Sequence, residues 1–394
     1  MTIKKENRRN VAIIAHVDHG KTTLVDQLFK QSGAFHNPDA IEDRLMDSLS
    51  LEKERGITIQ SKTGACFYKD HRINIIDTPG HADFGGEVER VLAMTDGVLF
   101  LVDAAEGPMP QSYFVLKKAV QHNLPIVVVM NKIDKPAARP DWVLDQVFDC
   151  LVQLDVPDEL LDFKTVYASA KEGFASNDPT VREGTMDLIF DSIIEQIPAP
   201  SADVDHPLQF QIASFSYSAF MGQLCIGRVR SGQVSVNDEV IIMTGDTPGE
   251  KTRVTKLYQF KANEQEEVDS AIAGDIVAIA GVKKASIGDT LCDPQDPIGL
   301  PGIHIDPPTL SITFMANDSP FSGQEGEFVT PNHVYDRLDR AALCDVALHV
   351  EKLAGERGIS VSGRGELHLG ILIENMRREG YEFQCSKPNV ILKE

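Results

Sequence analysis

A loop between an apolar run and a helical pattern constrains the fold of this chain more than any other feature. The run Val11–Ile14 is followed by Ala15-His16-Val17-Asp18-His19-Gly20-Lys21-Thr22, and a helical pattern starts at Thr23. In such a strand–loop–helix, backbone N–H groups of the loop and the helix N-terminus point at one place, which suits a polyphosphate. We expect Lys21 to reach the β- and γ-phosphates and the Thr22 hydroxyl to bind Mg²⁺. Because Ala15 departs from the strict pattern G-x-x-x-x-G-K-[ST], an ordinary helix start is the alternative.

Length and charge set the broad class of protein. A chain of 394 residues suggests about three domains. Its formal net charge is −21, from 38 Lys and Arg against 59 Asp and Glu. This balance excludes a general long-range attraction to nucleic acid, which needs clustered basic residues, although a local basic face stays compatible with it. Hydrophobic residues make up 42% of the chain, which favours packed cores over disorder.

The six cysteines are far apart in the sequence and form no C-x-x-C pair. We therefore expect free, buried thiols in a reducing cytosol rather than disulfides or a zinc site. The apolar run behind the basic N-terminus extends only from Val11 to Ala15, which is too short for a secretion signal or a membrane span. The expectation is a soluble cytoplasmic protein, monomeric and without a membrane partner.

Residues 1–200 carry the pattern of a mostly parallel sheet with helices on both faces. Near-continuous apolar runs, as strands buried on both faces require, alternate there with helical patterns. The runs are Val11–Ala15, Ile73–Ile76, Val98–Val102, Ile126–Met130 and Thr165–Ala168, and the helical patterns include Glu87–Met94 and Gln111–Gln121. A long polar segment, residues 32–57, interrupts the series and is expected to be mostly a solvated surface loop.

The sequence pattern changes after the proline-rich linker Ile197–Asp203. Short strand-like runs separated by turn residues predict a small antiparallel β-barrel over residues 201–300. The runs are Leu208–Phe215, Gly222–Val229, Glu239–Met243, Thr252–Leu257 and Ile276–Ala280.

A second proline-rich stretch, Pro294–Pro308, leads into residues 301–394. There the order strand, helix, strand, strand, helix, strand predicts a ferredoxin-like α+β domain. The segments are Thr309–Met315, Pro331–Leu343, Ala347–Val350, Gly358–Val361, Glu366–Arg378 and Tyr381–Phe383. One face of the second helix is apolar, and we interpret it as core packing rather than a cofactor site; it consists of Leu369, Leu372, Ile373 and Met376.

Two motifs complete the phosphate and metal end of the predicted site. In Asp77-Thr78-Pro79-Gly80-His81, which ends a predicted strand, Asp77 is expected to hold Mg²⁺ through water and the Gly80 N–H to contact a γ-phosphate. In Arg55-Gly56-Ile57-Thr58-Ile59, Thr58 supplies a second hydroxyl ligand for Mg²⁺. Neither motif is specific by itself, since aspartate and glycine end many strands.

Two further motifs select the base. In Asn131-Lys132-Ile133-Asp134, the Asp134 carboxylate can accept from both the ring N–H and the exocyclic amino group of guanine. Adenine would leave it unpaired, which can discriminate by about four orders of magnitude. We expect the Lys132 stem to lie along the base, and Ser169-Ala170-Lys171 to place backbone donors near the guanine carbonyl. Because these elements follow strands at the edge where open α/β sheets bind ligands, we predict a GTP or GDP site.

His81 is the candidate catalytic residue. Phosphoryl transfer needs a positioned water more than a strong base, and a histidine just after Gly80 is placed to orient that water. A surface or core histidine is the alternative. Val17 and Ile57 flank its path and are expected to hold it away from the nucleotide at rest. Since we identify no arginine finger in cis, we expect slow unaided turnover, on the order of 10⁻⁴ to 10⁻² per second, and an activator in trans.

Taken together, these motifs resemble the translational GTPases, in which a P-loop GTPase domain is followed by a β-barrel. More narrowly, the stretches His81–Leu92 and Glu106–Gln111 resemble the BipA (TypA) family, in which alanine at the first loop position is normal. Ser362–Gly370 resembles the third domain that this family shares with elongation factor G. The resemblance covers essentially the whole chain.

The resemblance implies a ribosome-binding GTPase that acts in large-subunit assembly and in translation under stress or cold. It also implies that Asp18–Thr23 and Asn131–Asp134 bind GTP, that Thr22 and Thr58 hold Mg²⁺, and that His81 serves hydrolysis once the ribosome positions it. Family members continue beyond the position of Glu394, so we expect this chain to be part of a longer protein. Contacts to tRNA and to the ribosomal catalytic centre would lie in that further part.

Two interpretations of different class stay open: a partner-activated GTP hydrolase, and a GTP-dependent binding or assembly module in which hydrolysis only resets the state. Among enzymes, an elongation-factor-type translocase is the alternative, and Gly85–Arg90 favours the BipA family over it. Four arginines on predicted helices are candidates for contact with ribosomal RNA, although a solvated helix face is favoured for any single one; they are Arg337, Arg340, Arg377 and Arg378.

Overall fold

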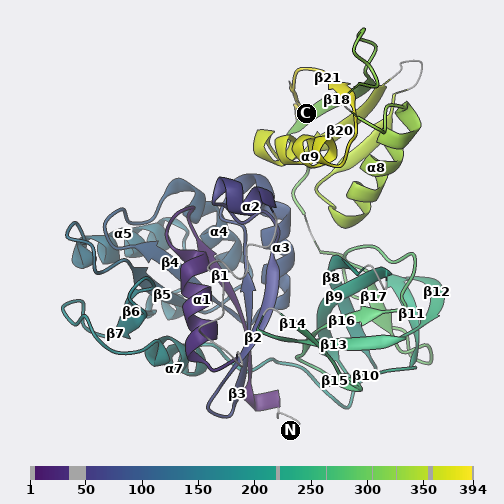
Figure 1. Ribbon diagram of the computed structural model, residues 1–394. Coiled ribbons are helices and arrows are strands. Elements are labelled where there is room, and N and C mark those ends of the chain that lie inside the picture. The colour runs from purple at the N-terminus through teal and green to yellow at the C-terminus, as the bar shows by residue number, and fades with distance from the viewer. Residues whose placement is uncertain are drawn as a thin grey trace. The chain divides into compact units, whose positions relative to one another are not determined.

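The computed structural model describes residues 5–34, 50–218, 222–262, 264–303, 305–324, 326–353 and 358–392. The chain divides into two compact units, and Figure 1 labels most of their elements. The first unit contains residues 1–82 and 87–303, and the second contains residues 83–86 and 304–394. Across the described ranges, no helix is both long and apolar enough to span a membrane.

A seven-stranded, mostly parallel sheet forms one part of the first unit. Its strands lie in the order β2-β3-β1-β4-β5-β6-β7, with parallel pairing from β3 to β6 and antiparallel pairing at both edges. The bounds are β1 (Arg8–Ala15), β2 (Lys62–Tyr68), β3 (His71–Asp77), β4 (Gly97–Asp103), β5 (Ile126–Asn131), β6 (Lys164–Ser169) and β7 (Phe174–Ser176). The predicted parallel sheet and its five apolar strands are confirmed.

Helices cover both faces of this sheet, also as predicted. Successive side chains of a strand point to opposite faces, and β1 divides accordingly: Val11 and Ile13 join one apolar core, whereas Ala12 and Ile14 join another. The first core includes side chains of α1 (Lys21–Gln31) and α7 (Asp187–Gln196); the second includes side chains of α3 (Gly85–Met94), α4 (Pro110–Gln121) and α5 (Pro140–Gln153). Shorter helices are η1 (Lys5–Asn7), α2 (Ser50–Arg55), η3 (Ala82–Phe84) and α6 (Asp158–Leu161).

The prediction of a solvated loop over residues 32–57 is wrong for its last part. Ser50–Arg55 is the helix α2, and the side chain of Glu52 is fully buried. Its carboxylate accepts hydrogen bonds from the backbone N–H groups of Ile59 (3.0 Å) and Gln60 (3.2 Å) and pairs with Lys62. These partners replace water around the charge, so this one carboxylate of the charged run can be buried. Residues 35–49 of the segment lie outside the described residues.

The second part of the first unit is an antiparallel sheet that surrounds its own apolar core. The strand order is β12-β11-β17-β8-β9-β16-β13-β14, and β10 pairs with β15 separately. The bounds are β8 (Gln209–Ser218), β9 (Gly222–Ser231), β10 (Gln233–Ser235), β11 (Glu239–Thr244), β12 (Thr247–Arg253), β13 (Lys256–Lys261), β14 (Glu264–Glu267), β15 (Ser270–Ile272), β16 (Ile276–Ala280) and β17 (Thr290–Cys292). We refer to this part as the barrel.

The single strand predicted at Thr252–Leu257 is wrong, because the chain changes direction inside it. β12 ends at Arg253 and β13 begins at Lys256. Between them the buried Val254 exchanges backbone hydrogen bonds with the turn at Asn237 and Asp238. The mixture of polar and apolar residues from Thr252 to Leu257 does not reveal such a change of strand partner.

The second unit has the predicted order strand, helix, strand, strand, helix, strand. Its sheet runs β19-β20-β18-β21, and β22 also pairs with β18. Helix α8 begins at Pro331, where the Thr330 hydroxyl accepts from the His333 N–H. In α9, Leu369, Leu372 and Met376 are buried in the core, which confirms the packing interpretation. The bounds are β18 (Leu310–Ala316), α8 (Pro331–Cys344), β19 (His349–Lys352), β20 (Gly358–Gly363), α9 (Glu366–Arg378), β21 (Phe383–Cys385) and β22 (Asn389–Val390).

Three of the four helix arginines named as candidates for RNA contact have partners within the second unit. Arg337 makes a bidentate pair with Glu379, at 2.6 and 2.7 Å, and Arg378 pairs with Glu374 at 2.9 Å. Arg340 donates to the Tyr381 hydroxyl at 3.2 Å. These contacts agree with the simpler interpretation of a solvated, paired helix face.

All six cysteines are free thiols, as predicted. Cys66, Cys225 and Cys292 are buried, and burial raises the pKa of Cys66 and of Cys225 to about 12. The prediction of buried thiols is wrong for Cys344 and Cys385, which are exposed. Both lie at ends of elements in the small second unit, where less surface is covered.

Candidate nucleotide-binding site

A cavity of about 240 Å³ lies at the carboxyl ends of the parallel strands. It brings together eight of the predicted site residues, from four separate motifs: Asp18, Gly20, Lys21, Thr22, Thr23, Thr58, Gly80 and Lys132. His16, Val17, Gly56 and Ile57 complete the lining. The loop residues and the strand-end motifs therefore meet at one place, as the pattern predicted.

The phosphate loop is shaped by two residues with positive φ. Asp18 has φ 64° and Gly20 has φ 91°, and Gly20 precedes the first residue of α1. A Cβ atom on Gly20 would lie 2.5 Å from Asn131 Nδ2, so both the conformation and the space require glycine. Helix α1 begins at Lys21, two residues before the predicted start. Its N-terminal N–H groups therefore point toward the cavity.

At one end of the cavity, three predicted phosphate and metal residues converge. The Lys21 ammonium donates to Thr58 Oγ1 at 2.9 Å and also pairs with the carboxylate of Asp77. The Thr58 hydroxyl lies 3.4 Å from the second oxygen of that carboxylate. All three side chains are buried. A hydroxyl and a carboxylate from distant parts of the sequence thus surround one cation.

At the other end, Asn131 links the predicted base motifs to the phosphate loop. Its Nδ2 donates to the His19 carbonyl at 2.8 Å, and its Oδ1 accepts from the Ala170 N–H at 2.9 Å. Lys132 has φ 61° and donates to the Asp18 carbonyl. The side chain of Asn131 therefore fixes three motifs relative to one another, a role that the sequence pattern did not specify.

The remaining predicted residues surround the cavity without lining it. Ile133, Ser169 and Ala170 are buried behind it, whereas Asp134 and Lys171 are exposed. His81 follows the lining residue Gly80 and is partly exposed; within the described part of the chain, it is not among the lining residues. Val17 and Ile57, predicted to flank the path of His81, do line the cavity. A Cβ on Gly80 would lie 2.9 Å from the Ala15 carbonyl, so Gly80 approaches the loop closely.

Comparison with family models and known proteins gives matches along nearly the whole chain. Residues 6–199 match the elongation factor Tu GTP binding domain, and residues 222–292 match elongation factor Tu domain 2. The large ribosomal subunit assembly factor BipA of Bacillus subtilis is 52% identical over 99% of this chain and 64% of its own length. Proteins of the same name from Salmonella typhimurium and Synechocystis are 51% and 52% identical, over 99% and 98% of this chain and 64% and 65% of their own lengths. The chain belongs to the BipA family of translational GTPases.

The chain spans 64% of the length of the Bacillus subtilis and Salmonella typhimurium BipA proteins. Among solved structures, a crystal structure from Thermus thermophilus matches 97% of this chain and 67% of that chain, with a TM-score of 0.74. At 19% identity, that likeness concerns the fold alone. The multidomain α/β architecture expected for a BipA family member is therefore confirmed.

Asp103 is a site residue that the sequence reasoning missed. Its fully buried carboxylate ends β4 and lies 2.9 Å from the Lys132 ammonium and 3.0 Å from that of Lys135. Burial alone would raise the pKa of Asp103, but the Ala105 N–H and the two ammonium groups lower it to about 2. A strand-terminal aspartate in Val102-Asp103-Ala104-Ala105 was the available signal. This aspartate did not indicate a site, because its partner Lys132 lies far away in the sequence.

The side chain of His19, which was predicted to bind the nucleotide, is fully buried. Burial, and secondly the neighbouring His16, lower the pKa of His19 to about 4, so the ring is neutral at physiological pH. The two rings lie edge to face with centroids 5.2 Å apart. Only the backbone of His19 contributes to the loop contacts described above, through the carbonyl that accepts from Asn131.

Proposed function

We propose that this chain binds GTP and GDP in the described cavity with Mg²⁺ and hydrolyses GTP to GDP and phosphate. The observation that carries the proposal is the convergence of Lys21, Thr58 and Asp77 at one end of the cavity. Asn131 joins the base motifs to the same loop at the other end. We also propose three domains, 1–200, 201–300 and 301–394, in which the first carries the whole nucleotide site.

Each end of the cavity has its own task in this proposal. The loop N–H groups and the N-terminus of α1 bind phosphate oxygens, and Lys21 turns from Asp77 to the β- and γ-phosphates. Asp134 accepts the two guanine N–H groups, while the Lys132 stem covers the base. Ser169, Ala170 and Lys171 supply backbone donors to the guanine carbonyl. The exposure of Asp134 suits a carboxylate that a ligand has to reach.

The donor set around Lys21 fits Mg²⁺. This ion prefers oxygen ligands, and the Thr58 hydroxyl and Asp77 carboxylate already surround a cationic group. Thr22 lines the same cavity. In the described residues, no group of three His, Cys, Asp or Glu side chains is arranged to hold a metal, so phosphate oxygens would complete the ligand set. When bound, Mg²⁺ neutralises the charge that develops on the transferring phosphate.

His81 orients the attacking water in this proposal. Val17 and Ile57 line the cavity together with Gly80, and we propose that they hold the histidine away from the nucleotide at rest. We propose that the ribosome moves His81 past these apolar side chains, and that hydrolysis serves large-subunit assembly, the process that the relatives are named for. The proposed cellular setting is the cytoplasm, with roles in stress and cold, as a monomer whose contacts to tRNA lie in further domains.

The test combines nucleotide binding with turnover. Wild type, H81A and the control H206A, at an exposed histidine that does not line the cavity, are titrated with a fluorescent GDP analogue, and GTP hydrolysis is followed with and without large ribosomal subunits. We expect guanine nucleotide binding by all three, stimulation of wild type and H206A by the subunits, and loss of about 10²-fold or more of the stimulated rate in H81A. Fast turnover by the chain alone, or an unchanged H81A, would contradict the proposed role of His81.

A GTP-dependent assembly module is the second candidate, because the predicted phosphate-binding residues line the cavity while His81 does not. In that case H81A would lose turnover but still complement a strain that lacks the family member. K21A, which removes phosphate binding, would fail in both assays. Complementation by H81A therefore decides between the two functions.

A further inference from the structure

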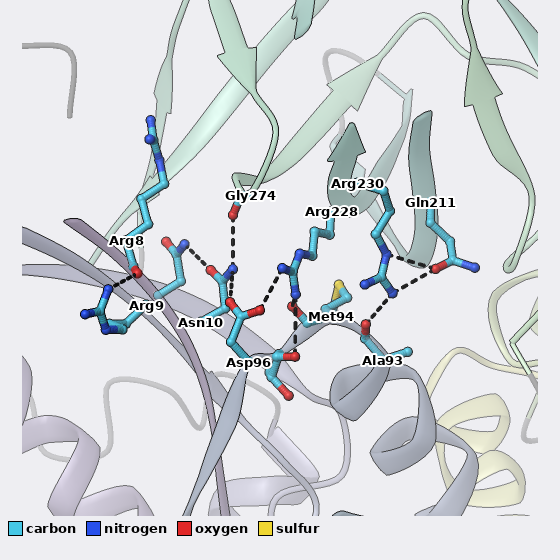
Figure 2. A network of polar contacts seen from close by, with 12 residues as sticks. Arg8, Arg9, Asn10, Ala93, Met94, Asp96, Gln211, Arg228, Arg230 and Gly274 are labelled. Atoms are coloured by element: carbon cyan, nitrogen blue, oxygen red, sulfur yellow. Dashed lines mark hydrogen bonds and ion pairs between the residues drawn. The ribbon is translucent and has the colours of Figure 1, made fainter. Parts of the chain in front are cut away.

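Two arginines of the barrel contact the end of the helix that follows Asp77–His81. Arg228 Nη1 donates to the carbonyl of Met94 at 3.0 Å, and its Nη2 pairs with the Asp96 carboxylate at 2.7 Å. Arg230 donates to the Ala93 carbonyl and, at 3.0 Å, to Gln211 Oε1. Figure 2 shows both guanidinium groups directed at this end of α3. We refer to Arg228 and Arg230 as the arginine pair.

The chemistry of a helix end explains this contact. The last carbonyls of an α-helix have no partner within the helix and carry the negative end of its dipole. Two guanidinium groups supply donors in fixed planes and positive charge at the same place. Arg228 is only 4% exposed. Burial, and secondly the charge of Arg228, lower the pKa of Arg230 to about 10, which leaves it protonated at neutral pH.

Further contacts join the barrel to the strand that leads into the phosphate loop. Asn10 of β1 donates from Nδ2 to the second oxygen of Asp96 (2.8 Å) and to the Gly274 carbonyl of the barrel (3.0 Å). Arg8, at the start of β1, pairs with the buried Asp275 at 2.7 Å. The carboxylate of Asp96 is thus shared between a barrel arginine and a β1 side chain (Figure 2).

The barrel also contacts the edge strand that follows Thr58. Ala65 of β2 and Ala262 exchange backbone hydrogen bonds of 3.1 and 2.6 Å, and Arg72 of β3 donates to the Phe260 carbonyl at 2.7 Å. The barrel therefore contacts β1, β2 and α3. These elements lead into the loop, follow Thr58 and follow His81, respectively.

From this arrangement we propose that Arg228 and Arg230 are positioning residues for GTP hydrolysis. They hold the C-terminal end of α3 in place, so that the segment Asp77–His81 moves relative to a fixed helix end when a γ-phosphate or the ribosome engages it. Without the pair, that end is free to shift, and His81 and Gly80 lose their defined position relative to the phosphate. The inference rests on the proposed GTPase function and names residues outside the cavity that serve it.

The arginine pair does more than hold the barrel against α3. The two residues lie two positions apart on β9 and place like charges close together in a buried region. Apolar side chains would join the two parts of the fold without the cost of burying these charges. Their donors end on three consecutive residues, Ala93 and Met94 at the end of α3 and Thr95 directly after it. The same region offers a matched reference: Arg8 is equally buried, but its ionic partner is a barrel carboxylate rather than the end of α3.

The experiment compares R228M, R230M and R230K with R8M. For each we would measure thermal unfolding, the affinities for GDP and a non-hydrolysable GTP analogue, and kcat and KM of GTP hydrolysis with large ribosomal subunits. We expect R228M and R230M to lower kcat about ten- to a hundredfold and to change the ratio of GTP-analogue to GDP affinity, with KM for GTP little changed. R230K should recover part of kcat. R8M should lower the unfolding temperature and keep both kcat and the affinity ratio.

A merely structural pair would give a different result. If R228M and R230M lowered the unfolding temperature as R8M does but kept kcat and the affinity ratio, the inference would be wrong. Equal loss of kcat in R8M would also overturn it, because the effect would then follow from loosening the barrel in general. Absence of hydrolysis by wild type would count against the proposed function instead, and the affinity ratio would still test the arginine pair.

Discussion

In the nucleotide cavity the ammonium of Lys21 is shared by Thr58 and Asp77, whereas at the barrel contact the guanidinium of Arg228 is shared by the Met94 carbonyl and Asp96. Both are buried cations held by oxygen atoms. The cation in the cavity borders open space of about 240 Å³ and sits on a flexible stem, so a phosphate can take it from its partners. The barrel arginine holds main-chain atoms that no ligand replaces. Similar groups are thus placed to meet a proposed ligand in one place and join two parts of the fold in the other.

The largest effect is expected for D134N, which tests the cavity side of this comparison. An amide presents an N–H donor where guanine needs an acceptor, so the ratio of GDP to xanthosine diphosphate affinity should fall by about four orders of magnitude. Competition titration with both nucleotides measures it. Because Asp134 is exposed, the unfolding temperature should stay unchanged. An unchanged affinity ratio would show that another residue reads the base.

The second-largest effect is expected for D275A, which tests the contact between the barrel and β1. Removing this carboxylate leaves Arg8 buried without its ionic partner, which should lower the free energy of unfolding by about 3–5 kcal/mol. Urea unfolding measures the loss. Nucleotide affinity should stay within twofold of wild type, since neither residue lines the cavity. A large loss of nucleotide affinity with an unchanged free energy of unfolding would show that this pair serves ligand binding rather than the joining of two parts of the fold.

A third effect links the phosphate loop to pH. The pKa of His19 is lowered to about 4 from 6.5, so its contribution to stability is present above pH 6.5 and is lost as the pH falls toward 4. The shift corresponds to about 3 kcal/mol in the free energy of unfolding. The difference between wild type and H19Q should show this dependence in urea unfolding at several pH values. H206Q, at an exposed histidine, is the control and should lack it.

The smallest effect is expected at Asp103. Its pKa of about 2, against the ordinary 3.8, gives stability that is present above pH 3.8 and is lost as the pH falls through 2. The difference in unfolding free energy between wild type and D103N should therefore shrink by about 2 kcal/mol between pH 5 and pH 2. D246N, at an exposed aspartate, is the control. D103N should also weaken GDP binding, because Lys132 loses a partner that fixes its stem.

Sequence patterns predicted the regular elements well where the signal is local. Strand β16 was predicted with its observed bounds, because it is an unbroken apolar run between turn residues, and α9 likewise, because its apolar face repeats at helical spacing. The antiparallel edges β2 and β7 were not predicted, since an edge strand is only half covered and mixes polar residues with apolar ones. Glu52 in α2 was assigned to solvent, because its partners Ile59 and Lys62 come later in the chain.

The sequence by itself determined the phosphate loop, the order of the motifs and the family, because each depends on short stretches with strict chemical requirements. Only the tertiary structure decided that Thr58 and Asp77 meet at Lys21, that Asp103 holds Lys132, and that Arg228 lies against Met94. These partners are separated by long stretches of chain, and packing of the sheet, its helices and the barrel brings them together. Their contacts depend on how whole elements pack, which no local pattern of residues encodes.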